Sequence, residues 1–206
     1  FSISRPIKHK KVMKNIIFSI ILLALFQGTM DAQTYSDREF TIKTFPVNAQ
    51  TNIEVNNKYG EIHVKTWRKD SVKFVIDLRI NSNSRDKLQK LKNDIRFDFT
   101  ASKYYVTASS NFGGTGNQIF AELRSLSESF IPGKNSIEVN YTIYCPESVN
   151  LNLINKFGDI YIDDLRGEIN INLSYGNMKI NSLSGESKIE LNFGNANINQ
   201  LSDAVI

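Results

Sequence analysis

The sequence predicts an all-β fold that ends in a single-stranded β-solenoid, a coil in which short strands stack on the strands of the next turn. Three observations lead to this prediction. Glycine recurs every nine residues, at positions 158, 167, 176, 185 and 194. Apolar and polar residues alternate between these glycines, and bulky side chains recur every eighteen residues. We therefore predict roughly three turns of eighteen residues each over 149–206.

Two types of block alternate between the glycines. Blocks of the first type place apolar residues two, four and seven positions after the glycine, as in Ile160, Ile162 and Leu165. Offsets of two and four describe a short strand with one buried face. An amphipathic helix is disfavoured, because a glycine every nine residues would weaken it by ~1 kcal/mol each time. The glycines, with neighbouring Asp, Asn or Glu, are typical of turns.

The recurrence at eighteen distinguishes a coil from a ladder of hairpins. In a coil residue i lies above residue i+18, so like side chains stack, whereas antiparallel neighbours gain nothing from such spacing. One turn cannot bury its own apolar face, and stacked turns form a continuous core. We expect further turns or a cap beyond residue 206, because an open end exposes strand edges. Two columns are expected in the core, Phe157, Tyr175 and Phe193, and Leu165, Leu183 and Leu201.

Residues 33–148 are predicted to form a β-rich N-terminal part with one inserted short helix at about 84–95. In that helix Leu88, Leu91 and Ile95 have helical spacing, and Ser84 is a candidate N-cap. The segment NKYGEIHV at 57–64 aligns with NKFGDIYI at 155–162 with identical Asn, Lys, Gly and Ile. The same strand-turn-strand unit is therefore expected twice.

Residues 1–32 are predicted to be a signal peptide with an upstream extension, the start being Met13. Lys14 is followed by an apolar run at 16–26, and Ala32 precedes a plausible cleavage site. A membrane anchor is disfavoured because the run is shorter than the ~20 residues that span a bilayer. We therefore expect an exported chain without a transmembrane span, located in the periplasm, at the outer-membrane surface or outside the cell.

Charge argues against nucleic acid as a partner. The chain has 25 Lys and Arg against 21 Asp and Glu, with a pI near 9.0. Five of the basic residues and only one acidic residue lie within 1–32, so the mature part is balanced. The clustered basic footprint that nucleic acid requires is not expected.

Few residues offer catalytic or metal chemistry. Cys145 is the only cysteine, so no intrachain disulfide or multi-cysteine metal site can form. The two histidines are His9 and His63, and His63 alternates with apolar neighbours as an exposed strand residue does. Serine-triad chemistry would depend on that one residue. We predict no enzyme activity, no catalytic residue, no metal and no cofactor.

Two local patterns have a chemical alternative. Acidic residues at 159, 163, 164 and 168 would suit a paired-carboxylate or calcium site, although acidic residues are also common in solvated turns. The blocks lack the doubled glycine and recurrent aspartate of the calcium-binding nonapeptide. Residues 113–116 (GGTG) lack the Lys and Ser/Thr of a phosphate loop, and we predict a flexible loop there.

Taken together, the signal ending in Ala-Gln, NKYGEIHVKTW, the inserted helix, NYTIYCPESVNLNL and the NKFGDIYI-type repeats resemble a known family. This is the putative adhesin family of exported bacterial β-solenoid domains, common in the Bacteroidetes. The resemblance covers most of residues 38–206. It implies a right-handed β-helical fold and export to the envelope, and it implies no established chemistry.

The function predicted is that of a non-enzymatic adhesion or interaction module of the cell envelope or surface. Partners would be glycans or other envelope proteins, held by the polar outward positions of the strands, and Trp67, Tyr104 and Tyr105 are further aromatic candidates. The alternatives are a polysaccharide-acting β-helix enzyme and a structural protein that self-associates end to end. The candidate binding residues are Tyr161, Asp163, Lys179, Asn181, Asn197 and Asn199.

Overall fold

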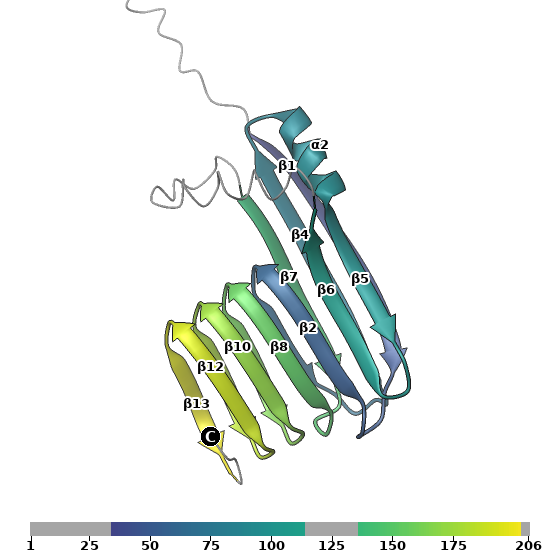
Figure 1. Ribbon diagram of the computed structural model, residues 1–206, viewed down its shortest axis with the longest axis vertical. Helices are drawn as coiled ribbons and strands as arrows, with labels where there is room; N and C mark the ends of the chain where they lie inside the picture. Colours follow the sequence, from purple (N-terminus) through teal and green to yellow (C-terminus); the bar gives the residue numbers. More distant parts are fainter. Residues whose placement is uncertain (1–33, 114–135, 203–206) are drawn as a thin grey trace, which may run out of the picture. The chain divides into compact units, whose positions relative to one another are not determined.

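The computed structural model describes residues 34–113 and 136–202, and these contain thirteen β-strands and one helix (Figure 1). The signal peptide predicted at 1–32, most of the GGTG sequence and residues 203–206 lie outside the described residues. The elements are β1 (Tyr35–Pro46), β2 (Asn52–Tyr59), β3 (Ile62–Thr66), β4 (Ser71–Ser82), α2 (Arg85–Asp94), β5 (Ile95–Ala101), β6 (Tyr105–Phe112), β7 (Ser136–Cys145), β8 (Asn150–Phe157), β9 (Ile160–Leu165), β10 (Ile169–Tyr175), β11 (Met178–Leu183), β12 (Ser187–Phe193) and β13 (Ala196–Leu201).

The strands form two sheets. One has seven strands in the order β1-β4-β7-β3-β9-β11-β13, and the other has six in the order β12-β10-β8-β2-β6-β5. In the first sheet β4 pairs antiparallel with β1 and β7, and the remaining pairs are parallel. In the second sheet only β5 and β6 pair antiparallel. Both sheets are therefore mixed.

This architecture corrects the predicted fold class. Over the described residues the chain is all-β with one short helix, but it is not a right-handed single-stranded β-solenoid built from eighteen-residue turns, because both sheets combine parallel and antiparallel pairs. Alternation of apolar and polar residues specifies which face a side chain occupies, but it does not specify the direction of the neighbouring strand. The long strands β4 and β7 pair antiparallel over nine residues and determine the arrangement of the N-terminal half.

The eighteen-residue recurrence corresponds to parallel register near the C-terminus. Ile171 pairs with Ile189, and Ile180 pairs with Ile198. The alignment of 57–64 with 155–162 is also a structural equivalence, because Tyr59 is the register partner of Phe157. Like side chains on neighbouring strands contact each other directly, which stabilises the pairing.

The hydrophobic core lies between the two sheets. Phe74 and Tyr141 from the seven-stranded sheet are fully buried, as is Leu153 from the six-stranded sheet. The buried Tyr141 hydroxyl lies 2.8 Å from Oγ of Ser110 on the other sheet, and burial raises its pKa. This hydrogen bond satisfies a polar group inside the core, where an unpaired one would cost ~1–3 kcal/mol.

Helix α2 covers one end of the core, inside the range predicted from the sequence. Ser84 is its N-cap, with Oγ accepting a hydrogen bond from the backbone N–H of Lys87, and Leu88 and Leu91 are buried. Lys92 forms an ion pair with Asp37 at 2.7 Å, which links the helix to β1. Within 34–113 and 136–202, no helix has the length and apolar character needed to cross a membrane.

Candidate binding face of the seven-stranded sheet

The six candidate residues lie on β9, β11 and β13, three neighbouring strands of the seven-stranded sheet. Lys179 is the register partner of both Tyr161 and Asn197, so these three form a row across the strands. The row continues to His63 on β3, which pairs with Tyr161. Residues in direct register on adjacent strands project to the same side of a sheet. We call this solvent-facing side the outer face.

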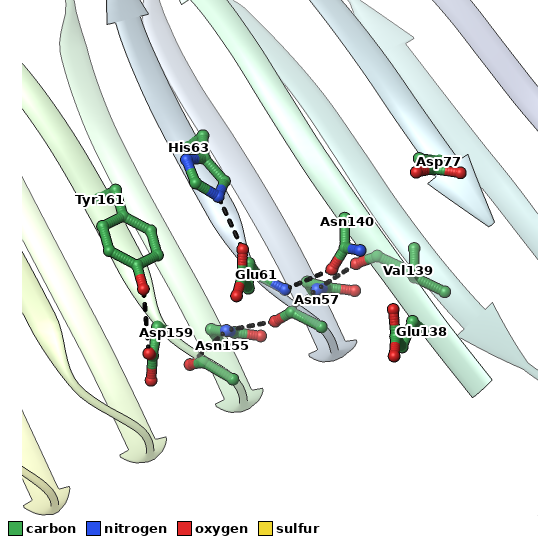
Figure 2. A network of polar contacts seen from close by, with 12 residues as sticks. Asn57, Glu61, His63, Asp77, Glu138, Val139, Asn140, Asn155, Asp159 and Tyr161 are labelled. Atoms are coloured by element: carbon green, nitrogen blue, oxygen red, sulfur yellow. Dashed lines mark hydrogen bonds and ion pairs between the residues drawn. The ribbon is translucent and has the colours of Figure 1, made fainter. Parts of the chain in front are cut away.

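His63 and Tyr161 form an aromatic pair in this row, on the neighbouring strands β3 and β9 (Figure 2). Their rings stack with centroids 4.5 Å apart and an interplanar angle of 17°. Nε2 of His63 lies 2.8 Å from Oε2 of Glu61, and the Tyr161 hydroxyl donates a hydrogen bond to Oδ2 of Asp159 at 3.1 Å. Burial, together with the adjacent Asp159 carboxylate, raises the pKa of Tyr161. The two stacked rings are thus flanked by the carboxylates of Glu61 and Asp159.

A ladder of side-chain amides lies next to this pair. Asn199 Nδ2 donates to Asn181 Oδ1 at 3.2 Å, and Asn181 Nδ2 donates to Asp164 Oδ1 at 2.6 Å. The sequence pattern assigned Asp163 to this column, whereas the structure places Asp164 there. Both aspartates are exposed, because two residues rather than one separate the buried Ile162 and Leu165. The register itself is unchanged, since Ile180 pairs with Ile162 and Leu183 with Leu165, so the Asn181 amide bonds diagonally to Asp164.

A second ladder follows the turns before β9, β11 and β13. The backbone N–H and Nδ2 of Asn195 donate to Asn177 Oδ1 at 3.2 and 3.3 Å. The same groups of Asn177 donate to Asp159 Oδ1 at 2.7 and 3.4 Å. The sequence analysis considered Asp159 only as a paired-carboxylate or calcium ligand and missed Asn177 and Asn195. The signal was the Asp or Asn that follows each of the glycines 158, 176 and 194.

Buried amides hold the turns that carry the carboxylates beside His63 and Tyr161 (Figure 2). Asn57 Nδ2 donates to the carbonyl of Val139 at 2.9 Å. Asn155 Nδ2 donates to the carbonyls of Gly60 and Gly158, both at 2.9 Å. Because these amides are buried and bonded to the turns, they restrict how the turns before β3 and β9 can move.

The aromatic column predicted for the core forms, but it lies partly at the surface. The rings of Tyr59, Phe157, Tyr175 and Phe193 stack in sequence with centroids 5.5, 5.1 and 4.9 Å apart. Tyr175 is 42% exposed and Phe193 is 62% exposed. Each of these residues ends its strand immediately before a turn, where the core between the sheets no longer covers it.

The other aromatic candidates differ in their surroundings. Tyr104, in the turn before β6, and Tyr105, the first residue of β6, are both exposed. Trp67 is half-buried, and its ring lies 5.5 Å from that of Tyr144, with Nε1 donating to the carbonyl of Ser71 at 2.8 Å. Trp67 is therefore held against the seven-stranded sheet by its contacts with Tyr144 and Ser71.

The single cysteine and the potential metal ligands of the described residues complete the list of reactive groups. Cys145 is fully buried, and burial together with the nearby Asp163 raises its pKa to about 12, so its thiolate is strongly disfavoured. In the part of the chain that the structure describes, no three His, Cys, Asp or Glu side chains form a group that could hold a metal ion. The outer face therefore combines stacked rings, hydrogen-bonded amides and charged side chains.

Comparison with known proteins finds distant structural similarities. No protein family model matches the sequence, and no curated protein matches it. The chain is similar to a putative cell adhesion protein from Clostridium sporogenes (10% identity, TM-score 0.37, 82% of this chain and 97% of that chain). It is also similar to a putative adhesin from Parabacteroides distasonis (11% identity, TM-score 0.32, 79% of this chain and 66% of that chain). A putative adhesin from Parabacteroides merdae is similar as well (9% identity, TM-score 0.27, 78% of this chain and 78% of that chain). TM-scores this low do not place the chain in a family.

Proposed function

We propose that this chain is a non-enzymatic adhesion module of the cell envelope or surface that binds glycans with its outer face. The observation that carries the proposal is the stacked pair of His63 and Tyr161 beside the Asn181 amide ladder. The six residues Tyr161, Asp163, Lys179, Asn181, Asn197 and Asn199 and the ring of His63 form the proposed contact surface.

The chemistry of this surface suits carbohydrate. An asparagine side chain both donates and accepts hydrogen bonds, as a sugar hydroxyl does. Neighbouring strands lie ~4.8 Å apart, so equivalent side chains recur at short, regular intervals along the sheet. An aromatic side chain adds rigid apolar area at little cost in conformational entropy. Many weak, repeated contacts of this kind favour an extended chain of similar units over a single small molecule.

The proposal is tested on a glycan array with the purified chain. Tyr161→Ala is expected to weaken binding to the best glycan at least about tenfold, as loss of a central aromatic contact does. Lys188→Ala is the control, because Lys188 lies on β12 of the other sheet. The absence of any bound glycan, or equal binding by both variants, would contradict the proposal. Turnover of an acidic polysaccharide, abolished by Asp163→Ala, would instead identify an enzyme.

Self-association is a second candidate function, and strand β13 favours it. Among the described strands, β13 is the last in the seven-stranded sheet, and its sequence ANINQL has no charged side chain. Charges on edge strands oppose pairing between molecules, and β13 lacks that protection. Light scattering that rises with concentration in the unaltered chain, and not in Ile198→Lys, would support this second function.

A further inference from the structure

A cluster of lysines and aromatic rings lies on the seven-stranded sheet, outside the six candidate residues. We call it the basic aromatic corner, and it comprises Lys65, Trp67, Lys69, Lys73 and Tyr144. The Lys73 ammonium lies 4.3 Å from the centroid of the Tyr144 ring and 5.6 Å from that of Trp67. The Lys69 ammonium lies 4.9 Å from the Trp67 centroid. Two cations therefore contact one indole ring.

Strand pairing brings these residues together on the outer face. Tyr144 on β7 is the register partner of Lys65 on β3 and of Lys73 on β4. The backbone N–H of Trp67 donates to the carbonyl of Cys145 at 2.9 Å, so Trp67 extends the pairing of β3 with β7. Lys65 lies two residues after His63 on β3, so its side chain projects to the same side as the His63 and Tyr161 rings.

Within the part of the chain that the structure describes, the cations of this corner are not neutralised by ion pairs. In the described ranges 34–113 and 136–202, other basic residues pair with carboxylates, among them Arg38 with Asp77 and Arg166 with Glu147. No ion pair joins Lys65, Lys69 or Lys73 to a carboxylate among the same residues. The adjacent turn adds Arg68 and one acidic residue, Asp70. The corner thus has a net positive charge.

We propose that the basic aromatic corner binds the carboxylate groups of an acidic glycan, a polymer of uronic acid units. This inference rests on the proposed function and names the class of glycan. The rings offer apolar area to the C–H face of a sugar, and the ammonium groups pair with its carboxylates. Cation–π contacts hold Lys69 and Lys73 against Trp67 before the ligand arrives, which reduces the entropy lost on binding.

The test compares two forms of one polymer. Polygalacturonate carries free carboxylates, and its methyl ester has the same backbone without the charge. The full chain is expected to bind the acid at least about tenfold more tightly at low salt, and the preference is expected to shrink as salt screens the charges. Equal binding of acid and ester would overturn this inference while leaving glycan binding intact. Failure to bind any glycan would overturn the proposed function as well.

Variants separate a specific site from general charge. Combined Lys65→Gln, Lys69→Gln and Lys73→Gln are expected to weaken polygalacturonate binding at least about tenfold, and the three Lys→Arg changes are expected to retain it. The matched control changes net charge equally at other exposed positions: Lys90→Gln, Lys103→Gln and Lys188→Gln. A loss of the same size in the control overturns the proposal, as does equal binding to anionic phospholipid vesicles.

Trp67 provides a second, independent readout. Trp67→Leu keeps an apolar side chain beside Tyr144 but removes the large ring and its hydrogen bond to the Ser71 carbonyl. We therefore expect weaker polygalacturonate binding by a chain that still unfolds cooperatively in urea. The quenching of indole fluorescence by the ligand is also expected to disappear, since Trp67 is the only tryptophan. Unchanged affinity in Trp67→Leu, or binding by the original chain without any change in fluorescence, would contradict the proposal.

Discussion

The imidazole of His63 stacks on the phenol ring of Tyr161, although the two residues are separated by almost half of the sequence. Their strands pair in parallel, and this register links the N-terminal and C-terminal parts of the seven-stranded sheet. The Tyr161 hydroxyl donates to Asp159, and Asp159 also accepts from Asn177. The ring pair is thus connected to the turn ladder.

The first prediction concerns the titration of Tyr161. Its phenol is expected to titrate above its ordinary pKa of 10.0, because burial and the Asp159 carboxylate both disfavour the phenolate. Asp159→Asn removes the negative charge and should move the pKa part of the way back. A difference absorbance titration against Tyr161→Phe isolates this group among the tyrosines. An identical titration with and without Asp159→Asn would contradict the assignment.

The second prediction concerns the turn glycine Gly158. Its φ is +128°, and a Cβ there would collide with the carbonyl of Gly60 on the neighbouring turn. Gly158→Ala is expected to lower the free energy of unfolding by at least about 2 kcal/mol in urea denaturation. Gly113→Ala is the control, because its Cβ would meet only Asp94 O at 3.7 Å and should cost under about 0.5 kcal/mol. Equal effects would show that the turns do not require glycine.

The third prediction concerns stability in acid. Asp77 accepts from Arg38 at 2.8 and 2.9 Å and from Arg79 at 2.7 and 3.0 Å, and these hydrogen bonds and charges lower its pKa below 3.8. A lowered folded-state pKa stabilises the protein above the unfolded-state value, and this contribution is lost as the pH falls through the folded-state value. Urea midpoints of Asp77→Asn should therefore fall less between about pH 5 and pH 2 than those of the original chain. Parallel curves would rule out this role for Asp77.

The fourth prediction places a carboxylate in the amide ladder. Asn181→Asp puts two carboxylates side by side, because Asn181 donates to Asp164. We expect a loss of about 1 kcal/mol in stability at neutral pH, removed below about pH 4 when a carboxylate is protonated. Asn197→Asp is the control, since Asn197 lies beside Lys179 and the new charge has a favourable neighbour. A pH-independent loss in Asn181→Asp would count against repulsion.

The fifth prediction concerns the single cysteine. Cys145 is fully buried with a pKa of about 12, so the folded chain is expected not to react with a thiol reagent at neutral to mildly alkaline pH. Unfolding in urea should expose the thiol and restore rapid reaction. Absorbance of the released thiolate measures both states. Fast reaction without urea would show that β7 opens readily.

Much of the local structure could be predicted from sequence because it depends on periodicity. Alternation places Ile160 and Ile162 in the core and Tyr161 outside, and capping plus helical spacing locates the helix that begins at Arg85. Strand direction could not be predicted in this way. A residue alternating in or out of a sheet satisfies parallel and antiparallel neighbours equally, so the solenoid prediction failed where β4 pairs with β1 and β7.

For the candidate surface, the sequence by itself determined that Tyr161, Lys179 and Asn197 face outward and recur every eighteen residues, but it wrongly placed Leu201 in the core, where the structure leaves it 39% exposed. Only the tertiary structure decided that Asp164 rather than Asp163 joins the ladder, and that His63 stacks on Tyr161. It also decided that the Trp67 ring packs against Tyr144 and that the ammonium groups of Lys69 and Lys73 contact that ring. The reason is physical: side-chain period is a local property of the backbone, whereas pairing between distant strands is decided by which arrangement buries both apolar faces and satisfies the backbone hydrogen bonds.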